Sequence, residues 1–500
     1  MLFNSLEFLW FFPTVILLYF IMRPQYRWAL LLVASYYFYM AWKPEYILLI
    51  VISTLIDYYC GRKMGEIEEK KKRRPYLYAS LLSNLGILFT FKYFGFFNDS
   101  LRTVVESLGA SYHGPTFDLI LPMGISFYTF QTLSYSVDVY NGNLKPEKHL
   151  GIFALFVSFF PQLVAGPIER ASNLLPQFHK VFRFESARVN SGLRQMLWGM
   201  FKKVVVADRL AVLVNAVYND PTEFGGLSLM LATFFFAFQI YCDFSGYSDI
   251  AIGAAKVMGY DLMTNFRTPY FSKSISEFWK RWHISLSTWF RDYVYIPMGG
   301  NRVVKWRWYY NLLITFLVSG LWHGANWTFV IWGGLHGFYL VASILLAPLR
   351  AKSNKLLGLK EGSVMMKAVD VLMIFSLVCL GWIFFRANTV QDAFYICTHL
   401  FSGIGAELAT FVETLKLMQI SLYLETTSGA SLGMTIWDLF LAFSGIGFIC
   451  VVEYIASKAE VMRRFNNLPV WLKWSVYWVL IYSIIFFRSF SSSEFIYFQF

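Results

Sequence analysis

Long apolar runs separated by short polar stretches recur along the whole chain. The runs lie at residues 5–22, 28–42, 46–60, 76–97, 118–139, 226–242, 309–322, 326–348, 366–386, 436–457 and 474–487. Shorter apolar pieces near 151–166, 193–217 and 390–402 are typical of re-entrant or interfacial segments. A helix needs roughly 20 mostly apolar residues to cross a bilayer, and lipid admits only helices and closed barrels. Because the runs are too continuous for barrel strands, the pattern predicts an all-α polytopic membrane protein with about 11 spans.

Composition and charge support this assignment. The chain is 57% hydrophobic and 15% charged, whereas soluble domains carry about 25% charged residues. The net charge of +12 does not indicate nucleic-acid binding, because Lys and Arg gather in short loops, as the positive-inside rule describes. The most basic loop is 61–75, with Arg62, Lys63, Lys70, Lys71, Lys72, Arg73 and Arg74. Placing it in the cytoplasm puts the N-terminus outside, and the basic loop 458–473 puts the C-terminus outside as well.

Polar and ionisable residues crowd into the middle third of the chain. We therefore expect one membrane-embedded domain over 1–500 with a catalytic core at about 118–345. His323 lies there between two apolar runs, close to Gly320 and Gly324, which leave room for a group to approach the backbone. Histidine takes and returns a proton near neutral pH, so His323 is a candidate base. The alternative is a histidine that caps a helix or bonds to a buried carbonyl.

A second histidine lies in the densely charged segment 277–292. Read as one helix, this segment places Phe278, Trp282 and Leu286 on an apolar stripe with His283 beside it. Its charges are too dense for a lipid-facing span, so the helix either lies in the interface or is enclosed by others. The alternative is an amphipathic surface helix whose histidine has no function.

Further polar residues are candidates for lining a donor or acceptor cavity. Asp243 and Asp249 could orient a histidine or pair with Arg267 or Arg281. The full set of cavity candidates is Ser126, Arg170, Asp243, Ser245, Asp249, Arg281, Trp322, Asn326 and His336. The five cysteines lack metal-ligand spacing, and the sequence has no P-loop, serine-nucleophile elbow or zinc motif. The sequence therefore favours histidine as a base over a metal or a serine nucleophile.

Together these motifs resemble the membrane-bound O-acyltransferase (MBOAT) family. The resemblance is strongest to its bacterial polysaccharide branch, which includes alginate and peptidoglycan O-acetylation proteins and, more distantly, the D-alanyl transferase of teichoic acids. It covers 1–345 and rests on segments 8–13, 121–127, 162–168, 243–249, 281–287 and 322–324. It implies a ring of tilted helices around a central tunnel, with His323 and His283 at the two active-site positions. It also implies transfer of an acyl group, expected to be acetyl, from a cytoplasmic thioester to an extracytoplasmic hydroxyl.

The resemblance also defines roles and partners. We assign the base to His323 and the oxyanion-stabilising role to His283, the two roles being exchangeable. The expected donor is acetyl-coenzyme A or an acyl carrier protein thioester, with no bound cofactor and no metal. Arg302, Lys305 and Arg307 could hold coenzyme A phosphates, although positive-inside topology explains them equally well. The implied setting is the bacterial inner membrane, with a polysaccharide acceptor and a periplasmic SGNH-type esterase or transferase as partner.

The chain ends in an aromatic tail at 491–500. Its Phe-x-Tyr-x-x-Phe pattern, formed by Phe495, Tyr497 and Phe500, is similar to the C-terminal motif of the small partner peptide in the D-alanyl branch, whose tyrosine accepts the acyl group. We therefore predict that Tyr497 carries the acyl group in transit. The alternative is an aromatic cluster that anchors the last helix at the membrane interface.

Three other functions stay open on this sequence. A transporter or flippase for a lipid-linked glycan would use broken helices and intramembrane charges, but it predicts repeated halves that are not visible here. A lipid- or protein-acylating MBOAT would share the histidines and use a long-chain donor. A non-catalytic scaffold would keep its function when His323 is replaced.

Overall fold

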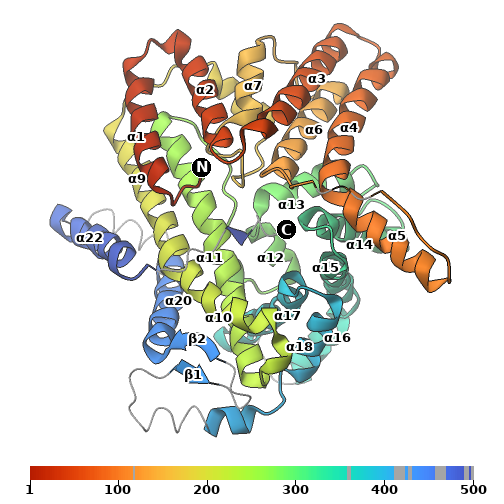
Figure 1. Cartoon of the computed structure of the whole chain (residues 1–500), viewed down its shortest axis with the longest axis vertical. Helices are drawn as coiled ribbons and strands as arrows, with labels where there is room; N and C mark the ends of the chain where they lie inside the picture. Colours follow the sequence, from red (N-terminus) through yellow and green to blue (C-terminus); the bar gives the residue numbers. More distant parts are fainter. Residues whose placement is uncertain are drawn as a thin grey trace. The chain divides into compact units, whose positions relative to one another are not determined.

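A computed structural model of the chain describes residues 1–115, 117, 119–356, 362–409, 423–425, 431–456, 469–488 and 495–496. These residues are almost entirely helical (Figure 1), which confirms the all-α assignment. The sheet in the described residues is one antiparallel pair, β1 (Tyr423–Glu425) and β2 (Ser431–Thr435). The chain divides into two compact units, Met1–Met196 with Tyr247–Thr264 and Leu197–Gly246 with Asn265–Phe500.

The helices follow the apolar runs in chain order. The first unit contains α1 (Leu6–Ile21), η1 (Pro24–Tyr26), α2 (Arg27–Met40), η2 (Pro44–Tyr46), α3 (Ile47–Glu66), η3 (Lys70–Arg73), α4 (Arg74–Leu88), η4 (Phe89–Tyr93), α5 (Phe94–Ser107), α6 (Ile125–Asn141), α7 (Leu150–Ser158) and α8 (Ala171–Phe178). The helices α9 (Ser186–Phe201) and α11 (Gly226–Met258) contribute residues to both units. The second unit contains η5 (Lys202–Ala207), α10 (Asp208–Asn219), η6 (Pro221–Glu223), η7 (Pro269–Phe271), α12 (Ile275–Arg281), α13 (Ile284–Phe290), η8 (Arg291–Tyr295), α14 (Lys305–His323), α15 (Trp327–Leu345), α16 (Ala347–Leu356), α17 (Val364–Arg386), α18 (Val390–His399), α20 (Ile436–Ala456) and α22 (Val470–Phe486).

Six helical stretches in the described residues are long and apolar enough to cross a membrane. They are Pro44–Glu66, Lys70–Ser107, Gly226–Met258, Trp327–Leu345, Val364–Arg386 and Trp437–Ala456. The apolar helices α1 and α22 are shorter. Other predicted spans form helices too short for a perpendicular crossing, such as α2 with 14 residues. At 1.5 Å per residue α2 reaches about 21 Å, less than the roughly 30 Å hydrocarbon core.

A buried polar network joins α3, α4 and α6 in the first unit. Asp57 on α3 accepts hydrogen bonds from the Asn84 side-chain amide at 2.9 Å and from the Ser80 hydroxyl at 2.5 Å. Ser80 also lies 2.7 Å from the Ser136 hydroxyl of α6, and Thr132 donates to Asn84. These contacts satisfy polar groups that lipid would leave unpaired, so they fix the three helices against one another.

The start of α6 depends on a glycine. Gly124 has φ +72°, a conformation that glycine adopts far more readily than other residues. A Cβ at Gly124 would lie 2.6 Å from the Leu163 carbonyl oxygen. The glycine therefore lets α6 begin directly against the turn that contains Leu163, and it places Ser126 in a buried position in the first turn of the helix.

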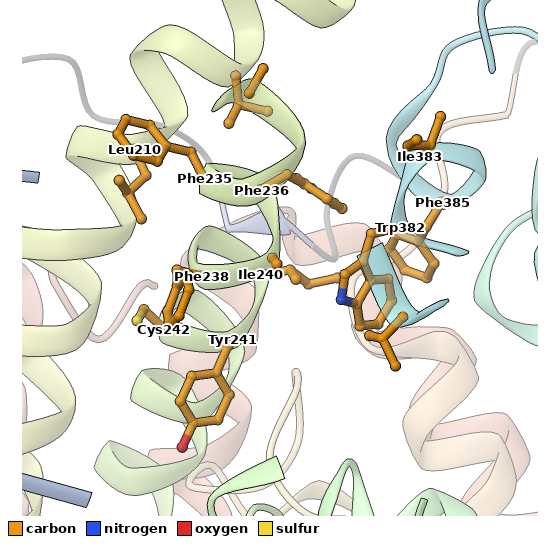
Figure 2. Close-up of a cluster of buried hydrophobic side chains, with 14 of the residues drawn as sticks. Leu210, Phe235, Phe236, Phe238, Ile240, Tyr241, Cys242, Trp382, Ile383 and Phe385 are labelled. Carbon is orange, nitrogen blue, oxygen red and sulfur yellow. The ribbon is translucent and has the colours of Figure 1, made fainter. Parts of the chain in front are cut away.

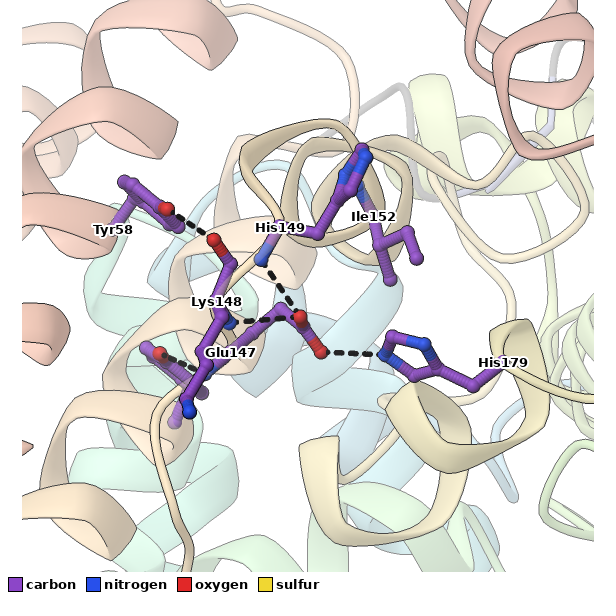
Figure 3. A network of polar contacts seen from close by, with 7 residues as sticks. Tyr58, Glu147, Lys148, His149, Ile152 and His179 are labelled. Carbon is purple, nitrogen blue, oxygen red and sulfur yellow. Dashed lines mark hydrogen bonds and ion pairs between the residues drawn. The ribbon is translucent and has the colours of Figure 1, made fainter. Parts of the chain in front are cut away.

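The loop before α7 is organised by one carboxylate (Figure 3). Glu147 Oε1 accepts from the backbone N–H groups of Lys148 and His149, both at 2.8 Å, and Glu147 Oε2 lies 2.8 Å from His179 Nε2 of α8. The His149 ring caps α7 by accepting from the Ile152 N–H. This network connects α7 and α8 within the first unit.

The second unit is built on a large aromatic core, part of which Figure 2 shows. Phe236 of α11 lies 6.3 Å from Trp382 and 6.4 Å from Phe385 of α17, measured between ring centroids. Trp332 of α15 stacks on Trp382 at 5.9 Å. Aromatic side chains from three helices thus form a rigid wall around the polar residues described next.

Candidate active site

His283 breaks the segment that we predicted as one helix. The structure has two short helices there, α12 and α13, and His283 between them adopts φ 42° and ψ 56°. The single-helix prediction is therefore wrong. The break is held by Asn265, whose carbonyl accepts from the Ile284 N–H at 2.9 Å and whose side chain accepts from the Ser285 hydroxyl at 3.0 Å. A left-handed residue other than glycine is strained, and such strain concentrates at functional sites.

His323 is the last residue of α14, and close packing of α14 on α15 fixes its position. A Cβ on Gly320 would lie 2.2 Å from the Phe329 carbonyl oxygen, and a Cβ on Gly333 would lie 2.2 Å from that of Phe316. Both glycines therefore permit direct backbone contact between the two helices. Gly320, which we interpreted from the sequence as leaving room beside His323, thus has a packing role.

The structure brings His283 and His323 together. Their ring centroids lie 6.3 Å apart, and the two side chains are 0% and 3% exposed. Trp322 contacts both rings, at 6.0 Å from His283 and 4.9 Å from His323. Two imidazoles at this spacing can act on the same reacting carbonyl from different sides.

Aromatic rings enclose the histidine pair. Phe244 of α11 contacts His283 edge-on at 4.6 Å between centroids. Trp332 and Phe385 contact His323 at 4.9 and 5.4 Å. Such walls exclude water, which strengthens any hydrogen bond that the imidazoles make to a developing charge.

A cavity of about 630 Å³ lies in the same unit, lined by residues of α12, α13, η8, α14 and α15. Its lining includes Ile284, the neighbour of His283, and Ser319, one turn before His323. Lys280 and Arg291 supply positive charge, while hydroxyl groups come from Ser276, Ser287, Thr288, Thr315, Ser319 and Ser343. The volume lies within the range of small-molecule sites.

Asp243 has a different partner from the two that we predicted. It lies inside α11, with Oδ1 2.8 Å from Lys203 Nζ. Arg281 instead pairs with Glu277 one turn earlier, at 2.6 Å. Ser245 accepts from Lys202 Nζ at 2.9 Å. The difference arises because α11 continues unbroken to Met258, so that its middle faces the lysines of η5.

The other predicted site residues are distributed as follows. Asn326 caps α15 by accepting from the Thr328 N–H. His336 is buried among aromatic rings, 5.0 Å from Trp332, which also contacts His323. Ser126, Arg170 and Asp249 belong to the first unit, where Asp249 accepts from the Gln195 side-chain amide. Tyr497 lies outside the described residues. The roles of all these residues stay predictions.

Sequence reasoning missed Asn265 and Lys203. Lys203 carried a usable signal, because it and Lys202 interrupt an apolar stretch, and buried lysines are functional candidates. Asn265 carried no such signal, because its role depends on a contact with the break at His283, which lies further along the chain. Within the described residues no group of three His, Cys, Asp or Glu side chains is placed to hold a metal ion.

Comparison with known proteins adds independent information. Residues 149–385, which contain both histidines, match the model of the MBOAT, membrane-bound O-acyltransferase family. A probable alginate O-acetylase AlgI of Pseudomonas putida is 36% identical over 521 residues and 100% of both chains. The corresponding protein of Pseudomonas aeruginosa is 40% identical over 80% of this chain and 75% of its own. A peptidoglycan O-acetyltransferase of Helicobacter pylori is 33% identical over 100% of this chain and 98% of its own.

Proposed function

Because the chain belongs to the membrane-bound O-acyltransferase family, we propose that it O-acetylates a cell-envelope polysaccharide or exopolysaccharide. The observation that carries the proposal is the buried His283–His323 pair, 6.3 Å apart beside a cavity. The relatives are named for activities on alginate and peptidoglycan, which supports a glycan acceptor over a lipid or a protein.

His323 is the general base in this proposal. It removes the proton from the attacking hydroxyl while the hydroxyl oxygen bonds to the thioester carbonyl carbon, and it then returns the proton to the leaving thiolate. His283 donates a hydrogen bond to the carbonyl oxygen as charge develops there. The C–S bond breaks, the ester C–O bond forms, and a free thiol leaves.

The cavity is the proposed donor site. An acyl thioester presents a polar carbonyl on an otherwise flexible and partly apolar arm, which suits a mixture of hydroxyl groups and aromatic walls. Lys280 and Arg291 favour an anionic donor. Arg302, just before α14, and Lys305 and Arg307 in its first turn are exposed, and Arg307 directly precedes the cavity-lining Trp308. These three side chains would bind phosphates at the entrance. Acetyl-coenzyme A and an acetylated carrier protein both fit this chemistry.

Tyr497 is the proposed acyl carrier. In the first transfer its phenol oxygen attacks the thioester and becomes an aryl ester, and in the second an acceptor hydroxyl takes the acyl group and restores the phenol. The burial of the preceding residues Phe495 and Ile496, which are 3% and 1% exposed, supports a tail seated in the protein rather than one anchored in the interface. A periplasmic SGNH-type partner at the bacterial inner membrane would complete delivery to the glycan.

The proposal is tested by following acyl groups through matched variants. Cells that lack the gene receive the wild type, His323→Ala or Tyr497→Phe, and bound O-acetyl on the surface glycan is measured against protein level in the membrane. We expect His323→Ala to lower transfer at least about 100-fold, in line with loss of a general base, and Tyr497→Phe to abolish it. Normal glycan acetylation in well-expressed His323→Ala would contradict the proposed function.

The carrier role has its own readout. Purified protein is incubated with isotopically labelled acetyl-coenzyme A or acetylated carrier protein, and its C-terminal peptide is analysed by mass spectrometry. We expect an acetyl adduct on Tyr497 in the wild type and none in His323→Ala. A Tyr497→Phe variant with full activity, together with an absent adduct, would leave the interface-anchor interpretation.

A further inference from the structure

The residues just before Tyr497 are held by a specific contact inside the second unit. The Ile496 N–H donates to Asp243 Oδ2 at 2.8 Å. The Phe495 ring lies 6.2 Å from the ring of Phe244, the next residue along α11. Phe495 and Ile496 therefore pack against α11 at Asp243 and Phe244.

The carboxylate that receives this N–H is fixed by a buried ion cluster. Lys203 Nζ lies 2.8 Å from Asp243 Oδ1 and 2.9 Å from Asp208 Oδ1. The side chains of Lys203, Asp208 and Asp243 are 8%, 5% and 3% exposed. A carboxylate held in an ion pair is a charged acceptor, so the bond from the Ile496 N–H is stronger than one between neutral groups.

Helix α10, which contains Asp208, also holds the chain just before the C-terminal tail. Arg209 follows Asp208 on α10, and its Nη2 donates to the Phe487 carbonyl oxygen at 2.8 Å, just beyond the end of α22. Arg209 also pairs with Asp438 of α20. The η5–α10 segment therefore fixes the chain at Phe487 and, through Lys203 and Asp243, again at Ile496.

We propose that Asp243 is a positioning residue that docks the C-terminal segment beside the catalytic pair. Phe244 connects the docked segment to the site, since its ring centroid lies 6.2 Å from that of Phe495 and 4.6 Å from that of His283. The bond uses the backbone N–H of residue 496, so this hydrogen bond can form with a different side chain there but not with proline, which lacks the N–H. The catalytic consequence rests on the proposed carrier role of Tyr497, whereas the docking contact does not.

Hydrogen–deuterium exchange of the C-terminal peptide tests docking directly. The variants are Asp243→Ala, which removes the acceptor, and Asp208→Ala, its matched control. Either substitution leaves Lys203 with one carboxylate, but Asp208→Ala keeps the bond to Ile496. In full-length protein in detergent or nanodiscs, we expect faster exchange at 495–496 in Asp243→Ala alone. Equal exchange in the wild type and Asp243→Ala would overturn the proposal.

A second pair of variants guards against misfolding of Asp243→Ala. Ile496→Pro removes the donor and leaves the ion cluster intact, and Ile496→Ala keeps the donor. We expect kcat for acetyl transfer to fall about 10-fold or more in Ile496→Pro and in Asp243→Ala, with the donor KM unchanged because neither residue lines the donor cavity. If the two changes act on one contact, the double variant loses no more than the single variants. Additive losses, or an equal loss in Ile496→Ala, would contradict docking through this hydrogen bond.

The two proposals fail in different ways. Full activity of Tyr497→Phe with increased exchange in Asp243→Ala would remove the carrier role and keep the docking residue. Unchanged exchange in Asp243→Ala would remove the docking residue, whatever Tyr497→Phe does.

Discussion

His283 combines burial, a left-handed backbone and contact with a second imidazole. It lies between the end of α12 and the start of α13, and its ring centroid is 6.3 Å from that of His323. Asn265 stabilises the turn from outside the motif. An inert surface histidine has no need of such support, and the geometry therefore favours a chemical role for His283.

The proposed roles of the two histidines predict different responses to substitution. If His283 stabilises charge, His283→Asn retains a hydrogen-bond donor and should keep more activity than His283→Ala. Initial rates of acetyl transfer at saturating donor, corrected for folded protein, measure the difference. The conformation also matters here, because asparagine tolerates the left-handed region better than alanine, so thermal stability of both variants has to be recorded. Equal losses of activity in two equally stable variants would show that the hydrogen-bond donor of asparagine cannot replace the imidazole of His283.

The sequence singled out the two histidines that the structure brings together, but it predicted little of their geometry. His323 was identified from its flanking glycines, and it does end a helix next to a close helix contact. His283 was identified inside a regular helix that does not exist, because the break depends on Asn265 and Arg267, which contact 281–285 through the backbone. Tertiary contacts of this kind leave no periodic signal in the sequence.

At the scale of elements, the α14–α15 hairpin is the scaffold of the site. It supplies His323 and Trp322 from one helix and Trp332 and His336 from the other. The predicted runs at 309–322 and 326–348 correspond closely to α14 and α15, because each run is a continuous apolar segment and a short turn separates the two. The close contact between α14 and α15 was not predictable in the same way, because a glycine in an apolar run does not indicate which helix packs against it.

The hairpin offers a matched pair of glycines for testing this packing. Gly333→Ala should destabilise the protein by about 1–3 kcal/mol through overpacking, because its Cβ would lie 2.2 Å from the Phe316 carbonyl oxygen. Gly334→Ala should be tolerated, since its Cβ would meet only Leu317 Cδ2, at 3.5 Å. Thermal unfolding in detergent, followed by acetyl transfer at a permissive temperature, separates the two. Equal stability of both variants would mean that α14 and α15 do not touch at Gly333.

For the whole molecule, the number of membrane crossings has to agree with the orientation that the charged loops predict for the two termini. If both termini lie outside, as the charge pattern predicts, the number of crossings is even, and the eleven runs then do not all span the bilayer. Helices such as α2, with 14 residues, are too short for a perpendicular crossing. Hydropathy thus located the helices well, whereas the number of true spans depends on tilt and packing that a single sequence does not encode.

The orientation of the tail is the prediction on which the direction of acyl transfer depends. Lys71 is exposed in the basic loop after α3, and the positive-inside rule puts that loop in the cytoplasm. A Lys71→Cys variant should therefore react with a membrane-impermeant maleimide in inverted vesicles and stay unlabelled in intact spheroplasts. A cysteine appended after Phe500 should show the opposite pattern, because the acyl group has to emerge on the side of the glycan. The five native cysteines are buried or partly buried, and the unmodified protein gives their background. Labelling of both engineered cysteines from the same side would contradict this topology.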